Sequence, residues 1–192
     1  IPNFVDHPDY WTKPPKNREQ TLAYALDLPA DFEPGKDYGY SNTNYMLIED
    51  LIDKTLGYPH QQYIKEKILI PLGLKHTYGS LNEVNMDDVM SGYYVGSETD
   101  FKYENTGLML ATAEDVGIFL RALNDGSVFD EGEQEIYSSI YVYEHTGLLP
   151  GYQSIAKYTK TRTWWSFNSI TPPTLMDMTG IWRKSFIAAL SK

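Results

Sequence analysis

The sequence predicts an α+β fold, in which a helical, loop-rich region is followed by a short antiparallel sheet with a packing helix. Two observations lead to this prediction. Apolar residues recur at helical spacing through the first two thirds of the chain. Beyond Asp130 the pattern changes to strand-length segments rich in β-branched and aromatic residues. We therefore expect a single domain, 1–192, with a helical part, 1–127, and a strand part, 128–192.

The composition is that of a globular domain with an acidic surface. Of the 192 residues, 42% are hydrophobic and 14% aromatic, which is enough for a core. The formal net charge of −10 repels polyanions, so nucleic acid is not an expected partner. No run of 18 apolar residues occurs, so the sequence predicts no transmembrane segment.

Metal and cofactor chemistry have little support in the sequence. The chain has no Cys, which excludes a disulfide framework, a thiolate metal site and a cysteine nucleophile. Its four histidines lie far apart, and no HExxH pattern occurs. We expect neither a metal nor a cofactor.

The helical region begins with a proline-rich segment. Six prolines between residues 1 and 36 exclude long helices, and we predict packed loops with one short helix near 19–28. The aromatic residues between these prolines are explained most simply as core filling. The alternative is that they form a wall of a substrate cleft.

The clearest helix follows this segment. Apolar residues between 47 and 56 recur at helical spacing, Asn42 or Thr43 is available as the N-cap, and Gly57 lies just past the end.

Two further helices complete the first region. One spans 59–69 and is expected to stop at Pro71-Leu72-Gly73. The other opens at Thr112, with Asp115 three residues later as in a capping box, and ends before Gly126.

The second region contains three strand candidates and a terminal helix. The strands are predicted at 136–143, 151–158 and 163–167. A helix over about 174–190 is expected to lie on the sheet, although Gly180 weakens it.

Tyr40 and Asn42 lie immediately before the clearest helix. There a loop can expose both side chains, and the helix N-terminus adds positive potential. A phenol and a carboxamide so placed suit an acyl-transfer site. The spacing alone favours a simpler alternative, in which Asn42 is a helix cap and Tyr40 is packing.

His145 precedes a turn-forming segment with two glycines and a proline, 146–151. Such a backbone can expose amide groups to a carbonyl oxygen, as an oxyanion hole requires, and the Leu148 N–H is our candidate donor. A structural or surface role for His145 is the simpler alternative.

The sequence contains one Ser-x-x-Lys pattern, Ser154 to Lys157. A serine activated by such a lysine needs both on one helix face. The surrounding residues favour a strand, in which residues three apart point to opposite faces. We therefore do not expect Ser154 to be a nucleophile.

Several segments together resemble the serine β-lactamase-like family, which holds class C β-lactamases, D-alanyl-D-alanine carboxypeptidases and related esterases. The resemblance covers residues 1 to about 167, in family order. It is carried by FEPG at 32–35 with YSNTNYML at 40–47, IPLGLKHT at 70–77, TGLMLATAED at 106–115 and HTGLLPGY at 145–152.

The resemblance implies a serine acyl-enzyme mechanism. Tyr40 would relay a proton from the nucleophile, Asn42 would hold the substrate amide or the family lysine, and His145 would line the cleft. Thr146 and Gly147 would form the strand edge that pairs with substrate, and the Leu148 N–H would be half of the oxyanion hole.

The family's Ser-x-x-Lys helix lies upstream of the segment that begins here at Ile1. We therefore expect an incomplete β-lactamase/transpeptidase-like fold, inactive alone. The missing N-terminal segment or another chain would cover the sheet edge. The parent protein is expected to hydrolyse β-lactam, D-amino-acid peptide or small ester substrates, in the periplasm or outside the cell. The alternative is a non-catalytic binding or regulatory domain that keeps the cleft.

Overall fold

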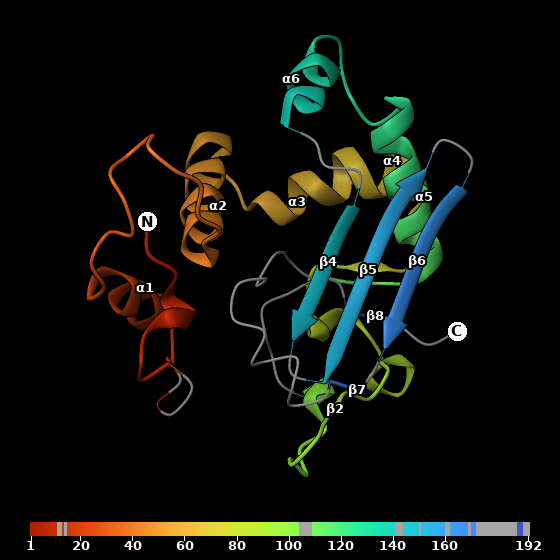
Figure 1. Ribbon diagram of the computed structural model, residues 1–192. Helices are drawn as coiled ribbons and strands as arrows, with labels where there is room; N and C mark the ends of the chain where they lie inside the picture. The colour runs from red at the N-terminus through yellow and green to blue at the C-terminus, as the bar shows by residue number, and fades with distance from the viewer. Residues whose placement is uncertain are drawn as a thin grey trace. The chain divides into compact units, whose positions relative to one another are not determined.

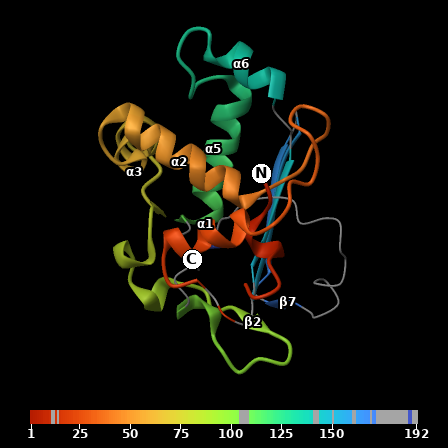
Figure 2. The same cartoon turned by 90° about the vertical axis from the view of Figure 1, so that its left-hand side faces the viewer.

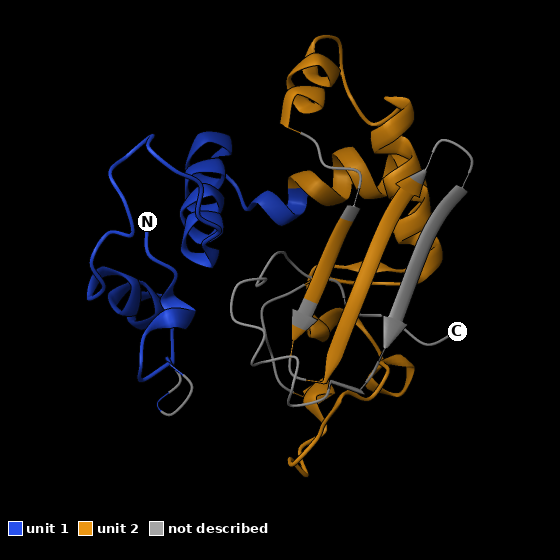
Figure 3. Cartoon of the chain, viewed as in Figure 1, with its two compact units in different colours: residues 1–62 blue, residues 63–192 orange. Residues whose placement is uncertain are grey.

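The computed structural model describes residues 1–10, 13, 15–103, 109–140, 144–149, 151–159, 162–168, 170–171 and 188–189. Figure 1 shows the elements in chain order, and Figure 3 shows that the chain divides into two compact units. The first unit is Ile1–Gln62 and the second is Tyr63–Lys192.

The first unit contains η1 (Phe4–Asp6), α1 (Arg18–Leu26) and α2 (Asn42–Leu56). The short helix predicted near 19–28 is confirmed as α1, whose N-cap Asn17 accepts a hydrogen bond from the backbone N–H of Gln20 at 2.9 Å. Helix α1 contacts η1 and buries Ala25.

Helix α2 confirms the clearest sequence prediction, but its N-cap is Ser41 rather than Asn42 or Thr43. The Ser41 side chain makes no capping hydrogen bond. The first backbone N–H of the helix, from Asn42, donates to Asn3 Oδ1 instead. The cap therefore comes from a distant residue, which local spacing cannot indicate. At the other end Gly57 has φ 75°, the left-handed conformation that glycine favours.

The helix predicted at 59–69 consists of α3 (His60–Ile64), the π-helical η2 (Lys65–Leu69) and α4 (Ile70–Leu72). The expected stop within Pro71-Leu72-Gly73 is confirmed, because the helix continues through Pro71 to Leu72 and ends at Gly73. A proline ring ordinarily clashes with the carbonyl four residues earlier. Here the wider π-helical turns immediately before Pro71 change that spacing.

The second unit is organised around α5 (Ala113–Asp125), where the predicted capping is confirmed. Thr112 Oγ1 accepts from the backbone N–H of Asp115 at 3.3 Å, and Gly126 ends the helix at φ 83°. Val116 and Leu120 are buried on its inner face.

The Asp115 carboxylate connects this helix to an earlier segment. It is 4% exposed, and its Oδ2 accepts from the backbone N–H of His76 and from Thr77 Oγ1, both at 2.8 Å. Strand β1 (Thr77–Tyr78) then pairs antiparallel with β3 (Leu110–Ala111).

The largest sheet is antiparallel, with the order β4 (Glu144–Leu149), β5 (Tyr152–Thr159), β6 (Arg162–Asn168). It confirms the strands predicted at 151–158 and 163–167. Gly147 on β4 lies opposite Ser154 on β5, which lies opposite Phe167 on β6. Helix α5 packs along β5 and β6, as Figures 1 and 2 show.

The strand predicted at 136–143 was wrong, because residues 133–140 form helix α6 (Glu133–Ile140). Local capping outweighs the β-propensity of this segment. The backbone N–H of Asp130 donates to Glu133 Oε2 at 2.8 Å, and acidic residues in the first turn favour a helix N-terminus. Residues 141–143 lie outside the described residues.

The terminal helix predicted at 174–190 was wrong at Ala188–Ala189, which form β8, parallel to β3. Pairing with β3 requires an extended backbone there. The rest of that range lies outside the described residues. Strand β7 (Ile170–Thr171) pairs parallel with β2 (Tyr93–Tyr94), and three short 3₁₀ segments complete the fold, η3 (Leu81–Glu83), η4 (Met86–Asp88) and η5 (Phe101–Tyr103).

Candidate active site

The first unit brings together two of the predicted site residues. Tyr40 OH donates to Asn42 Oδ1 at 3.1 Å. The backbone N–H and the side-chain Nδ2 of Asn42 both donate to Asn3 Oδ1, at 3.1 and 3.2 Å. Tyr40 and Asn42 are half-buried, whereas Asn3 is only 6% exposed. A phenol, a carboxamide and a supporting carboxamide thus form one chain of hydrogen bonds at the start of α2.

Hydroxyl groups on both sides of Asn42 tie the N-terminal segment to α2. Ser41 Oγ and Thr43 Oγ1 donate to the Pro2 carbonyl oxygen at 3.1 and 2.8 Å. The backbone N–H of Phe4 donates to Thr43 Oγ1 at 3.1 Å. Both hydroxyl residues are nearly fully buried.

Sequence reasoning missed these supporting residues. They lie about 40 positions from the segment that they bind, and no local pattern marks them.

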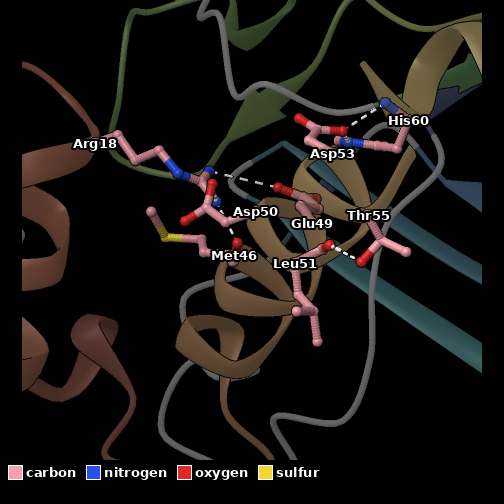
Figure 4. Close-up of polar contacts among 8 residues, drawn as sticks. All are labelled: Arg18, Met46, Glu49, Asp50, Leu51, Asp53, Thr55 and His60. Atoms are coloured by element: carbon pink, nitrogen blue, oxygen red, sulfur yellow. Dashed lines mark hydrogen bonds and ion pairs between the residues drawn. The ribbon is translucent and has the colours of Figure 1, made fainter. Parts of the chain in front are cut away.

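Polar contacts at the surface of α2 hold the remainder of this helix in place, as Figure 4 shows. Arg18 reaches from α1 to Glu49 at 3.4 Å and Asp50 at 2.8 Å, and it donates to the Met46 carbonyl oxygen. Exposed ion pairs contribute little individually. A guanidinium that binds three acceptors at once nevertheless restrains the approach of the two helices.

The turn after α2 is closed by Asp53 and His60. Asp53 Oδ1 accepts from the His60 backbone N–H and lies 2.8 Å from His60 Nδ1 (Figure 4). The backbone hydrogen bond is the main cause that lowers the pKa of Asp53, and the imidazole acts in the same direction.

The second unit carries the other predicted site residues on β4. His145 lies opposite Ala156, Thr146 opposite Ile155, and Leu148 opposite Gln153. Strand alternation places the side chains of neighbouring residues on opposite faces. His145 is half-buried, Thr146 exposed and Gly147 buried. In the described three-stranded sheet β4 is an outer strand.

The turn between β4 and β5 packs closely against the segment around Gly92, and this packing requires glycine on both sides. Tyr152 OH donates to the Met90 carbonyl oxygen at 2.7 Å, and burial raises the pKa of this phenol. A Cβ on Gly92 would lie 2.4 Å from the Tyr152 ring. A Cβ on Gly151, which has φ 82°, would lie 2.6 Å from the Gly92 backbone. Only glycine fits at either position.

Asp100 holds the Gly92 segment in place. Its Oδ1 accepts from the backbone N–H groups of Gly92 at 2.9 Å and Lys102 at 3.1 Å. Burial opposes ionisation of Asp100, but hydrogen bonds from Ser91, Lys102 and Gly92 outweigh it and lower the pKa. Gly92 stands in an aromatic, strand-like segment, where a glycine indicates a close backbone approach. Sequence reasoning overlooked this signal.

Ser154 and Lys157 lie on β5, so they point to opposite faces of the sheet. The prediction that Ser154 and Lys157 lie on a strand, and so cannot form a helix-face pair, is confirmed. Among the described residues no group of three or more His, Asp and Glu could hold a metal ion. No helix in the described ranges is long and apolar enough to span a membrane.

The two groups of predicted site residues belong to different units. Tyr40 and Asn42 are in the first unit, whereas His145, Thr146, Gly147 and Leu148 are in the second. That the two groups act in one site, as the family resemblance implies, stays a prediction.

Similarity to known proteins covers most of the chain at the level of fold. A D-stereospecific amidohydrolase from Streptomyces sp. has a TM-score of 0.70 at 19% identity, covering 88% of this chain and 64% of that protein. The D-amino acid amidase from Ochrobactrum anthropi SV3, complexed with D-phenylalanine, has a TM-score of 0.68 at 21% identity, covering 88% and 71%. A penicillin-binding protein from Bacillus halodurans has a TM-score of 0.72 at 16% identity, covering 89% and 66%.

The similarity to curated sequences is more local. A putative D-alanyl-D-alanine carboxypeptidase of Escherichia coli K12 is 36% identical over 62 residues, 32% of this chain and 14% of the relative. An N-acetylmuramyl-L-alanine amidase of Bacillus subtilis is 34% identical over 62 residues, again 32% of this chain and 14% of the relative. The matched segment is thus a small part of each relative.

The structural neighbours establish the expected architecture, an incomplete β-lactamase/transpeptidase-like fold. The family model described as Beta-lactamase matches residues 1–171, far more than half of the sequence. The chain therefore belongs to the Beta-lactamase family.

Proposed function

We propose that the protein to which this chain belongs is a serine hydrolase that forms an acyl-enzyme on β-lactam, D-amino-acid peptide or small ester substrates. The observation that carries the proposal is the hydrogen-bonded pair Tyr40 and Asn42 at the N-terminus of α2, in a chain that belongs to the Beta-lactamase family. Structural neighbours described as a D-stereospecific amidohydrolase and a D-amino acid amidase favour D-configured substrates.

In the proposed reaction a serine hydroxyl attacks the substrate carbonyl carbon. Its proton passes through Tyr40 to the leaving amine or alkoxide, and water later hydrolyses the acyl-enzyme. Asn42 holds the substrate amide or the activating lysine. His145 lines the cleft, Thr146 and Gly147 pair with the substrate backbone, and the Leu148 N–H stabilises the oxyanion.

We further propose that the nucleophile comes from polypeptide outside these 192 residues. The one Ser-x-x-Lys in the sequence lies on a strand, where it cannot form the required helix-face pair. The chain alone is then inactive, and the partner segment, from the same protein or another copy, also covers the sheet edge at β4. A periplasmic or secreted location follows the family resemblance.

An acylating probe tests the proposal. Full-length protein should be labelled by a fluorescent penicillin or a fluorophosphonate, and the 192-residue chain should not. Tyr40→Phe should slow labelling about 100-fold, because a general acid–base group typically contributes 10²–10⁴-fold. Full-length protein that resists every probe yet binds a D-amino-acid peptide would favour the alternative, a non-catalytic binding or regulatory domain.

A further inference from the structure

We propose that Asn3 is a positioning residue for this site. It sets the orientation of the Asn42 carboxamide and, through it, the direction of the Tyr40 hydroxyl proton. The catalytic consequence rests on the proposed function. The orientation itself is a property of the Ile1–Gln62 unit alone.

One group in this hydrogen-bonded chain has a single possible role. The backbone N–H of Asn42 can only donate, and it lies 3.1 Å from the Asn3 side chain. The Asn3 atom that faces it must therefore be the carbonyl oxygen Oδ1. The same oxygen lies 3.2 Å from the Asn42 carboxamide, which must present its Nδ2.

The orientation of Asn42 determines the role of the phenol. With Nδ2 turned toward Asn3, Asn42 Oδ1 faces Tyr40 OH at 3.1 Å. A carboxamide oxygen can only accept, so Tyr40 must donate. The phenol oxygen keeps its lone pairs for a hydrogen bond from the attacking serine hydroxyl, and the Tyr40 proton turns from Asn42 Oδ1 to the leaving group when the proposed relay runs. If the Asn42 carboxamide turned over, two oxygens would face each other across the gap to Asn3.

The surroundings of Asn3 restrict its freedom to follow such a change. Its side chain is 6% exposed. The residues before and after it, Pro2 and Phe4, are both hydrogen-bonded to Thr43 in the first turn of α2. A side chain whose backbone is tied on both sides can impose a geometry on its partner.

The orientation can be measured by NMR exchange on the 192-residue chain. The Asn42 Nδ2 proton that faces Asn3 should exchange with water more slowly than the side-chain amide protons of the exposed Asn82. This first measurement needs no variant. Equal exchange rates for Asn42 and Asn82 would overturn the proposal.

Two substitutions separate positioning from packing. Asn3→Leu keeps the approximate size but removes the acceptor, and protection of Asn42 should be lost. Asn3→Asp should retain the protection, because a carboxylate oxygen accepts from both donors and the N-terminus of α2 favours its charge. Loss of protection in the folded Asn3→Asp chain would contradict the proposal, even if Asn3→Leu does not fold.

Ser41→Ala is the matched control. It removes one hydrogen bond from the same tether, to the Pro2 carbonyl, and leaves both contacts between Asn3 and Asn42. Protection of Asn42 should persist. If Ser41→Ala abolished it as fully as Asn3→Leu, general loosening would explain both results and Asn3 would have no positioning role.

The catalytic consequence is read from the labelling rate of full-length protein. Asn3→Leu should slow acylation about 10- to 100-fold, since small misplacements cost that much, and Asn3→Asp should restore most of the rate. Unchanged labelling in Asn3→Leu would overturn the positioning role but not the proposed function. No labelling of the unaltered protein would remove the proposed function, and the exchange measurement would still decide the orientation.

Discussion

The N-terminal end of α2 and the outer strand β4 carry the two groups of proposed site residues, and different bonds hold them. At α2, buried side chains bind a segment that lies about 40 positions earlier in the sequence. At β4, backbone pairing with β5 holds the strand in place, and the adjoining turn requires glycine at two positions. The α2 end is therefore sensitive to loss of single polar atoms, whereas the β4 turn is sensitive to added volume.

The largest effect is expected from Gly151→Ala at the β4–β5 turn. The new methyl group would lie 2.6 Å from the Gly92 backbone, which cannot move aside as a flexible side chain can. We expect a loss of more than about 3 kcal/mol in the free energy of unfolding, measured by urea denaturation.

Gly96→Ala is the matched control for this substitution. Gly96 has φ 90° but nothing within 4 Å of a built Cβ. It should cost only the left-handed backbone strain, about 1 to 2 kcal/mol. Equal losses at the two glycines would show that volume is not what the turn excludes.

Thr43→Val tests the polar end of the comparison. The substitution keeps the shape but leaves the Phe4 N–H without its acceptor, and it removes the shorter of the two hydrogen bonds to the Pro2 carbonyl, at a site that is 1% exposed. We expect a loss of about 2 to 3 kcal/mol in the free energy of unfolding. Thr55→Val, on the exposed face of the same helix, should change it by less than about 0.5 kcal/mol. Similar effects would contradict the importance of the tether.

Tyr152→Phe isolates the polar contribution within the glycine-dependent turn. The ring stays, and only the hydrogen bond to the Met90 carbonyl is removed. The expected loss is about 1 kcal/mol by thermal or urea unfolding. Tyr24→Phe, which removes an exposed hydrogen bond to Lys13, serves as the control. A loss above that of Thr43→Val would reverse the contrast between the two regions.

The smallest effect concerns pH and the turn after α2. The folded-state pKa of Asp53 is lowered from 3.8, so its contribution to stability is present above that pH and is lost as pH falls below it. Asp53→Asn should therefore reduce the difference in stability between neutral and acidic pH. Identical pH profiles for the two proteins, followed by urea unfolding, would show that the His60 contact contributes nothing.

The parts of the fold that the sequence predicts well are those with local signals. Helix α5 has its cap, apolar spacing and terminal glycine within one segment, and the strands β5 and β6 have uniform β-branched and aromatic content. Helix α6 was missed because its tyrosine and isoleucine content suggests a strand. The deciding interactions, acidic residues in the first turn and the contact from Asp130, lie at its edge.

The candidate site follows the same division. Tyr40 and Asn42 could be selected because they adjoin a predictable helix. The roles of Asn3 and Thr43 could not be predicted, because they depend on segments that are far away in the sequence. Gly92 did carry a local signal, a glycine in an aromatic, strand-like segment, which was overlooked. The catalytic roles of Tyr40, Asn42 and His145 stay predictions, as does the treatment of 1–192 as a single domain.

The Asp115 carboxylate has a consequence for how this family can diversify. By binding His76 and Thr77 it ties the start of β1 to the start of α5, and the pairing of β1 with β3 brings the two ends of the long connection between these strands together. The entropic cost of closing that connection grows only slowly with its length. Insertions at the exposed Gly96, where nothing lies within 4 Å of a built Cβ, should therefore be tolerated without unfolding the helix, which makes that position a suitable place to engineer new surface recognition.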